Sequence, residues 1–122
     1  DMVVRGAPAI GVAAAMGIAL ATQKMRDADL QRGFERVCRL FANSRPTAVN
    51  LTWAVDRMRR AYGRHRGRPA EIVREVLRQE AIAIHDEDIL ANRAMGAHGA
   101  KLIPKNATVL THCNAGALAT AG

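Results

Sequence analysis

Residues 107–120 read ATVLTHCNAGALAT, and this stretch predicts a strand that delivers a thiol to the start of a helix. Its first part, Ala107 to Thr111, is short and contains β-branched residues, whereas the residues after Cys113 are small and rich in helix formers. Free N–H groups and the helix dipole at such a junction favour the thiolate, the nucleophilic form of cysteine. The alternative interpretation is a buried, unreactive thiol, because free cysteine often behaves as a small apolar residue.

Two further segments place an arginine directly before a predicted helix. Arg5 to Gly11 leads into a long apolar helical pattern, and Gly6 lacks a Cβ, so this turn can approach an anion such as phosphate closely. Arg45 precedes Pro46, which favours an extended backbone at the arginine and a helix start just after it. There the charge of Arg45 opposes the helix dipole unless an anion lies between them. Either segment alone is also typical of a helix start that binds nothing.

Taken together and in order, the three segments resemble the signatures of the methylthioribose-1-phosphate isomerase family, the aldose–ketose isomerases of methionine salvage. The matching parts are Arg5–Gly11, Arg45–Leu51 with Trp53 and Ala54, and Thr111–Thr120. The resemblance implies conversion of 5-methylthioribose 1-phosphate to 5-methylthioribulose 1-phosphate, without a cofactor, by a cytoplasmic homodimer. It also implies that Cys113 is the catalytic cysteine. The implied substrate-binding residues are Arg5, Gly6, Ala7 and Arg45.

The family also uses an aspartate as the acid/base partner of its cysteine, in a later segment that this sequence does not contain. The chain begins at Asp1, four residues before Arg5, and ends at Gly122, two residues after Thr120. We therefore expect the natural protein to continue well beyond Gly122, and we expect this fragment to be inactive alone.

Two other functions within the same superfamily stay open. A ribose-1,5-bisphosphate isomerase would share a cysteine at this place but would need a second phosphate site. The regulatory subunits of the translation-initiation nucleotide-exchange factor are similar in fold and act by binding partners. An intact Cys113 followed downstream by an aspartate supports an isomerase, whereas a binding subunit needs neither.

A basic helical RNA-binding module is a further possible function, suggested by the charge. The net charge is +7, and six of the eighteen basic residues lie between Arg57 and Arg68. Only one aromatic residue, Tyr62, lies among these arginines, and no nucleic-acid-binding motif is present. We therefore interpret the cluster as a solvated, arginine-rich helix end and expect no nucleic-acid partner.

The remaining pattern is helical, over residues 9–24, 29–43 and 47–63 and from about residue 69 to 102, with a bend near His85. Leu51, Val55, Met58 and Tyr62 recur at helical spacing and predict an amphipathic helix with one apolar face, and Cys38 falls on a similar stripe. The fold prediction is a mainly helical N-terminal domain (1–104), followed by the first strand and helix of a truncated α/β, Rossmann-like domain (105–122). An unpaired strand at Ala107–Thr111 would expose its backbone edges.

The sequence predicts neither a metal site nor a membrane segment. Cys38 and Cys113 lie far apart, and no histidine stands at metal-ligand spacing. The run from His85 to Asp88 cannot converge on one ion, because consecutive helical residues fan around the axis, so we interpret it as a solvated acidic turn. The apolar run over residues 7–21 is broken by proline and glycine and is shorter than the roughly 20 residues that a membrane span needs.

Overall fold

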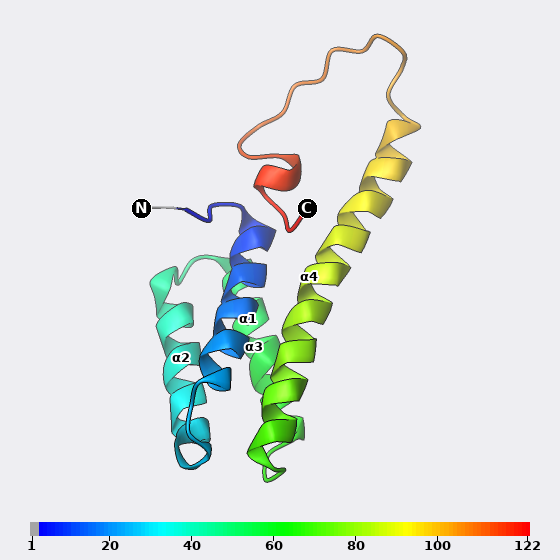
Figure 1. Ribbon diagram of the computed structural model, residues 1–122. Coiled ribbons are helices and arrows are strands. Elements are labelled where there is room, and N and C mark those ends of the chain that lie inside the picture. Colours follow the sequence, from blue (N-terminus) through cyan, green and yellow to red (C-terminus); the bar gives the residue numbers. More distant parts are fainter. Residues whose placement is uncertain (1–2) are drawn as a thin grey trace.

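A computed structural model describes residues 3–122 and contains four α-helices. These are α1 (Ala7–Gln23), α2 (Leu30–Ser44), α3 (Val49–Arg64) and α4 (Ala70–Ala100), with short 3-10 turns η1 (Asp27–Asp29) and η2 (Gly116–Leu118). Figure 1 shows α1, α2 and α3 side by side, with α4 packed along α1 and α3 and extending past their ends. The four-helix prediction is confirmed for the described residues; Asp1 and Met2, which the predicted first domain includes, lie outside them.

The core of the bundle is aliphatic and lies around α1, which packs against each of the other three helices. Cys38 is fully buried beside Phe34, so its assignment to the core is confirmed. The ring of Phe34 stacks on that of Tyr62 with centroids 4.4 Å apart. The predicted stripe on α3 is also confirmed, because Leu51, Val55 and Met58 are buried and Tyr62 packs half-buried against the core.

Small residues let α1 and α3 approach each other closely. A Cβ at Gly11 would lie only 2.7 Å from the carbonyl oxygen of Asn50, so a glycine is needed at this crossing. Ala15 and Ala54 are fully buried in the same region of the bundle. Dispersion contacts between tightly packed backbones therefore replace the large aromatic side chains that the composition lacks.

The expected bend in the last helix is wrong, because α4 continues without interruption from Ala70 to Ala100. The residues interpreted as a solvated acidic turn are helical, and each of three acids has its own partner. Asp86 lies 2.8 Å from Nδ1 of His85, Glu87 pairs with Arg57, and Asp88 accepts a hydrogen bond from the backbone of Ala121. The three carboxylates point to different sides of the helix, and each has a separate partner. The acidic run is therefore compatible with a continuous helix.

The predicted strand at Ala107–Thr111 and the helix after Ala115 are absent from residues 3–122, where η2 is the only regular turn beyond α4. Residues 101–118 are exposed and run from the far end of α4 back to the N-terminal end of α1 (Figure 1). A strand needs a neighbour for its N–H and C=O groups, and the described part of the chain offers none. None of the described helices combines the length and the apolarity needed to span a membrane.

Candidate active site

The first predicted binding turn, Arg5 to Ala7, forms the N-terminus of α1. Arg5 is exposed, and Gly6 is buried in an extended conformation as the residue that precedes the helix. A Cβ at Gly6 would overlap the backbone of Ala119, so the space that the glycine leaves is filled by the third motif rather than left open for an anion. The Ala9 N–H donates to the Ala119 carbonyl at 3.1 Å. The N–H of Ala7 therefore stays as the first-turn donor without a partner among the described residues.

Arg45 lies at the C-terminal end of α2 and not at the start of α3. Its backbone is not helical (φ −146°, ψ 80°), which fits its position before Pro46, but α3 begins only at Val49. Positive charge at a helix C-terminus is favoured by the dipole, so the predicted conflict between Arg45 and a helix N-terminus does not arise. The side chain is exposed to solvent.

The first two motifs meet at one end of the bundle, around a hollow of about 350 Å³. Arg45 lies on its wall together with residues next to the Arg5 turn. The lining consists of Val3, Val4, Ile10, Ala13, Ala14, Phe41, Ser44, Arg45 and Leu51. An arginine beside an apolar wall suits a ligand that has both an anionic group and an apolar part.

Cys113 is exposed and lies in the connection between α4 and η2. The interpretation as a buried thiol is therefore wrong for this structure, and the helix that was expected to favour its thiolate is not formed. Its φ of +63° is uncommon for a residue other than glycine. Such backbone conformations cluster at functional sites, where the surrounding structure maintains them.

The third motif returns to the first through its last residues. Ala119 contacts Gly6 and accepts the hydrogen bond from Ala9, and the Ala121 N–H donates to Oδ2 of Asp88 at 2.7 Å. The chain therefore brings the segment that carries Cys113 to the N-terminal end of α1, between α1 and α4 (Figure 1).

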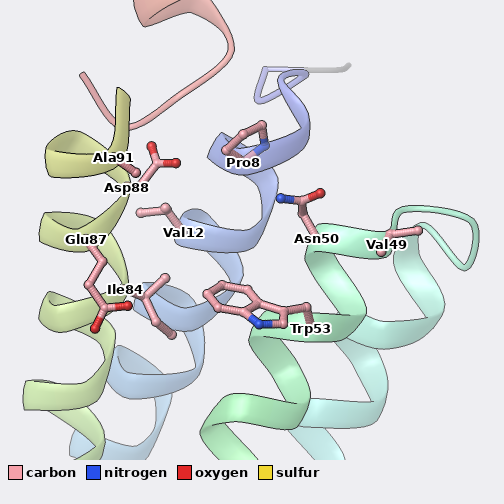
Figure 2. Close-up of a pocket in the computed structure, with 9 residues that line it drawn as sticks. All are labelled: Pro8, Val12, Val49, Asn50, Trp53, Ile84, Glu87, Asp88 and Ala91. Carbon is pink, nitrogen blue, oxygen red and sulfur yellow. The ribbon is translucent and has the colours of Figure 1, made fainter. Parts of the chain in front are cut away.

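A second hollow, of about 440 Å³, opens between α1, α3 and α4 next to this junction. Figure 2 shows the Trp53 ring pointing from α3 toward Ile84 on α4, with Val12 of α1 between the two helices. The full lining is Pro8, Val12, Val49, Asn50, Trp53, Ile84, Glu87, Asp88 and Ala91. Pro8 comes from the first motif and Val49, Asn50 and Trp53 from the second or just after it, so the hollow joins two of the three signatures.

Sequence analysis missed the two acids of this hollow, Glu87 and Asp88. Together with Ile84 and Ala91 they follow the spacing i, i+3, i+4, i+7, which places all four on one face of a continuous helix. This spacing is present in the sequence, but it points to a shared face only if the acidic run is assigned to a helix. Because a bend is expected at His85, residues 84–91 are not assigned to one helix face.

Arg57 forms an ion-pair network at the edge of the same hollow. Its Nε donates to Glu80 at 2.6 Å, its Nη2 donates to Glu87 at 2.8 Å, and its guanidinium lies 5.5 Å from the centre of the Trp53 ring. The hydrogen bond to Glu87 raises the pKa of Arg57, and Arg57 in turn lowers the pKa of the Glu87 carboxyl. Only 19% of the Arg57 side chain is exposed, so its interpretation as a solvated residue is wrong.

Among residues 3–122, no group of three or more histidine, cysteine, aspartate or glutamate side chains is arranged to hold a metal ion. The described residues at this end of the bundle include two exposed arginine side chains, the N–H of Ala7 and an exposed thiol. These groups suit the binding of a phosphorylated small molecule and proton transfer to or from it.

The chain is 56% identical to methylthioribose-1-phosphate isomerase of Geobacter sulfurreducens over 99% of its length, and 52% identical to the enzyme of that name from Koribacter versatilis. It spans 36% and 35% of these two proteins, which is about a third of their length.

Two crystal structures match the fold over nearly the whole chain. With 5-methylthioribose 1-phosphate isomerase from Pyrococcus horikoshii OT3 the TM-score is 0.91 at 44% identity, covering 98% of this chain and 34% of that one. With the translation initiation factor eIF-2B, subunit delta, from A. fulgidus the TM-score is 0.83 at 42% identity, covering 97% and 35%. The model of the Initiation factor 2 subunit family matches residues 3–121, and the chain belongs to that family.

Proposed function

We propose that this chain is the helical N-terminal region of a methylthioribose-1-phosphate isomerase. The observation that carries the proposal is the 56% identity to a relative of that name over 99% of the chain. The fold match at a TM-score of 0.91 to a solved 5-methylthioribose 1-phosphate isomerase supports it. Because the chain spans only 36% of the first relative, the activity belongs to a protein that also contains a later segment, which supplies the aspartate.

In this proposal the substrate phosphate binds at the N-terminal end of α1. Arg5 and the N–H of Ala7 face it, and Arg45 contributes a second positive charge from the end of α2. Gly6 takes part through its backbone and lets the Ala119 segment approach. The hydrogen bond between Ala9 and Ala119 supports this arrangement, because it holds the first and third motifs together.

The reaction moves one hydrogen from C2 to C1 of the sugar, so C2 is oxidised to the ketone and C1 is reduced, with no net gain or loss of electrons. The bond between C1 and the ring oxygen breaks, the ring oxygen takes up a proton, and the C2 hydroxyl gives up a proton as it becomes the carbonyl. Phosphate on C1 prevents simple opening to a free aldehyde, so acid–base groups must assist these steps. Cys113 and the aspartate from the later segment take these roles on opposite sides of the C1–C2 region.

The proposal includes a Rossmann-like domain in the whole protein, in which Ala107–Thr111 becomes the first strand. The exposure of residues 107–111 supports it, since these residues are free to pair with a sheet that the rest of the protein supplies.

The proposal also includes a cytoplasmic homodimer that needs no cofactor and binds no nucleic acid. Light scattering of the whole protein tests the dimer, and RNA titration tests the nucleic-acid point, since RNA binding through the arginines would weaken steeply with salt.

The second candidate function is that of a non-catalytic subunit of a translation initiation factor. The match to the A. fulgidus subunit, with a TM-score of 0.83 at 42% identity, is the observation that favours it. The isomerase stands first because eight curated relatives of that name share 48–56% identity with the chain.

The variant Cys113→Ser in the full-length protein tests the proposed function. A positioned acid or base typically contributes about 10²- to 10⁴-fold, so kcat should fall by roughly that factor. His112→Gln is the matched control, because His112 is the exposed neighbour of Cys113 and has no role in the proposal. Near-normal turnover by Cys113→Ser would remove Cys113 from the mechanism.

A further inference from the structure

The end of the chain is seated on the helical bundle by a small set of contacts. The Ala9 N–H donates to the Ala119 carbonyl at 3.1 Å, the backbone of Ala119 packs over Gly6, and Gly122 approaches Ile89. The fourth contact is the hydrogen bond from the Ala121 N–H to Oδ2 of Asp88, at 2.7 Å. Together these contacts fix residues 119–122 between α1 and α4.

Asp88 differs from the other members of this set because its side chain makes the contact. Within the described residues it forms the one side-chain hydrogen bond between residues 3–100 and residues 101–122. Asp88 is half-buried on α4 and lies on the face that lines the hollow of Figure 2. Its neighbour Glu87 is already held by Arg57, which leaves Asp88 to bind the returning segment.

We propose that Asp88 is a positioning residue that fixes the segment bearing Cys113 against the Arg5–Ala7 turn. The inference rests on the proposed isomerase function and names a residue that supports its site. Residues 101–118 are exposed, so the place of Cys113 depends on where this connection is anchored at its two ends. The C-terminal anchor is at residues 119–122, and a carboxylate that accepts an N–H forms a stronger hydrogen bond than a neutral pair does.

This role predicts a specific kinetic signature. Among the described residues Asp88 forms no hydrogen bond or ion pair with Arg5 or Arg45, so its loss should leave phosphate binding intact and displace the thiol. A displacement of about 1 Å can reduce the rate roughly 10²-fold, so kcat should fall by about 10- to 100-fold. KM should stay within about twofold, because the interactions that are lost act in the transition state.

The experiment compares Asp88→Ala, Asp88→Asn and Asp86→Ala in the full-length protein. Asparagine keeps an oxygen that can accept the Ala121 N–H, so Asp88→Asn should retain most of the activity. Asp86→Ala is the matched control, because Asp86 lies on the same helix and contacts His85 instead of the returning segment. Hydrogen exchange of residues 116–122 should be faster in Asp88→Ala and unchanged in the other two variants.

Wild-type exchange together with wild-type kcat in Asp88→Ala would overturn the inference. An equal loss of kcat in Asp88→Ala and Asp88→Asn would also overturn it, since a role that needs the charge itself is not positioning. If Asp88→Ala fails to fold, Asp88→Asn still tests the inference, because a loss of kcat or faster exchange of residues 116–122 in that variant would overturn it. A folded wild-type protein without turnover contradicts the isomerase function, whereas the exchange comparison still decides whether Asp88 seats the segment.

Discussion

Replacing Arg57 with methionine should destabilise the protein although an unbranched stem remains. Arg57 joins α3 to α4 through Glu80 and Glu87 and lies over the ring of Trp53. Loss of the guanidinium leaves the carboxylate of Glu80, whose side chain is only 19% exposed, with Arg64 at 3.7 Å as its nearest remaining cation. The network thus loses its central cation.

The magnitude follows from the exposure of each partner. A hydrogen bond between charged groups as sheltered as Arg57 and Glu80 contributes about 1.5 to 3 kcal/mol. Glu87 is 57% exposed, so its share is below about 1 kcal/mol, and the contact with the ring of Trp53 adds about 0.5 kcal/mol. Because Arg64 still neutralises part of the Glu80 charge, we expect a total loss of about 2 to 3 kcal/mol in the free energy of unfolding.

Urea unfolding followed by far-ultraviolet circular dichroism measures this loss, with Arg60→Met as the control. Arg60 is exposed on the same helix and has no ion pair among the described residues, so its replacement should change stability by less than about 0.5 kcal/mol. Equal effects of the two substitutions would refute the role given to Arg57.

Acid provides a further check on the same network. Arg57 lowers the pKa of Glu87, so the unfolded state takes up the proton first as the pH falls. The contribution of Glu87 is present above its unfolded pKa of about 4.3 and is lost as the pH drops through its lower folded value. The stability gap between the wild type and Arg57→Met should therefore narrow in acid below about pH 4.

Gly11→Ala should destabilise the fold by about 1 to 3 kcal/mol, because the added Cβ would lie 2.7 Å from the Asn50 carbonyl oxygen. Gly96 has open space around it on α4, so Gly96→Ala should stabilise the fold by about 0.5 to 1 kcal/mol. Urea unfolding that ranks the two variants in the opposite order would contradict the packing described. A thiol reagent at neutral pH should label Cys113 quickly and Cys38 only after unfolding, so rapid labelling of both in the folded state would contradict the burial of Cys38. Burial also raises the pKa of Cys38 to about 12, so stability measured by denaturation should fall as the pH rises above the unfolded value of about 8.5.

Local periodicity was enough to predict the helices and much of the core. Leu51, Val55 and Met58 follow one face of a helix, and burial of that face is what makes the pattern readable in a single sequence. The three motifs likewise identified the family, and the structure brings the first and third of them into contact at Gly6 and Ala119.

Features that depend on partners distant in the chain could not be predicted in this way. Arg57 belongs to a polar pattern on α3, and only the packing of α4 turns it from a solvated side chain into the centre of an ion-pair network. The run at Ala107–Thr111 has the composition of a strand but lacks a neighbouring strand within residues 3–122, so its backbone stays exposed to water. Asp88 acquires its partner only when the chain returns at Ala121.

The central claim is tested most directly by an NMR time course of the full-length protein with methylthioribose-1-phosphate. The account predicts a build-up of the 1-phosphorylated ketose, 5-methylthioribulose 1-phosphate, and no comparable turnover of ribose-1,5-bisphosphate. Preferential turnover of the bisphosphate would contradict the substrate assignment. A folded protein that converts neither sugar would contradict the isomerase function and favour the non-catalytic subunit of a translation initiation factor.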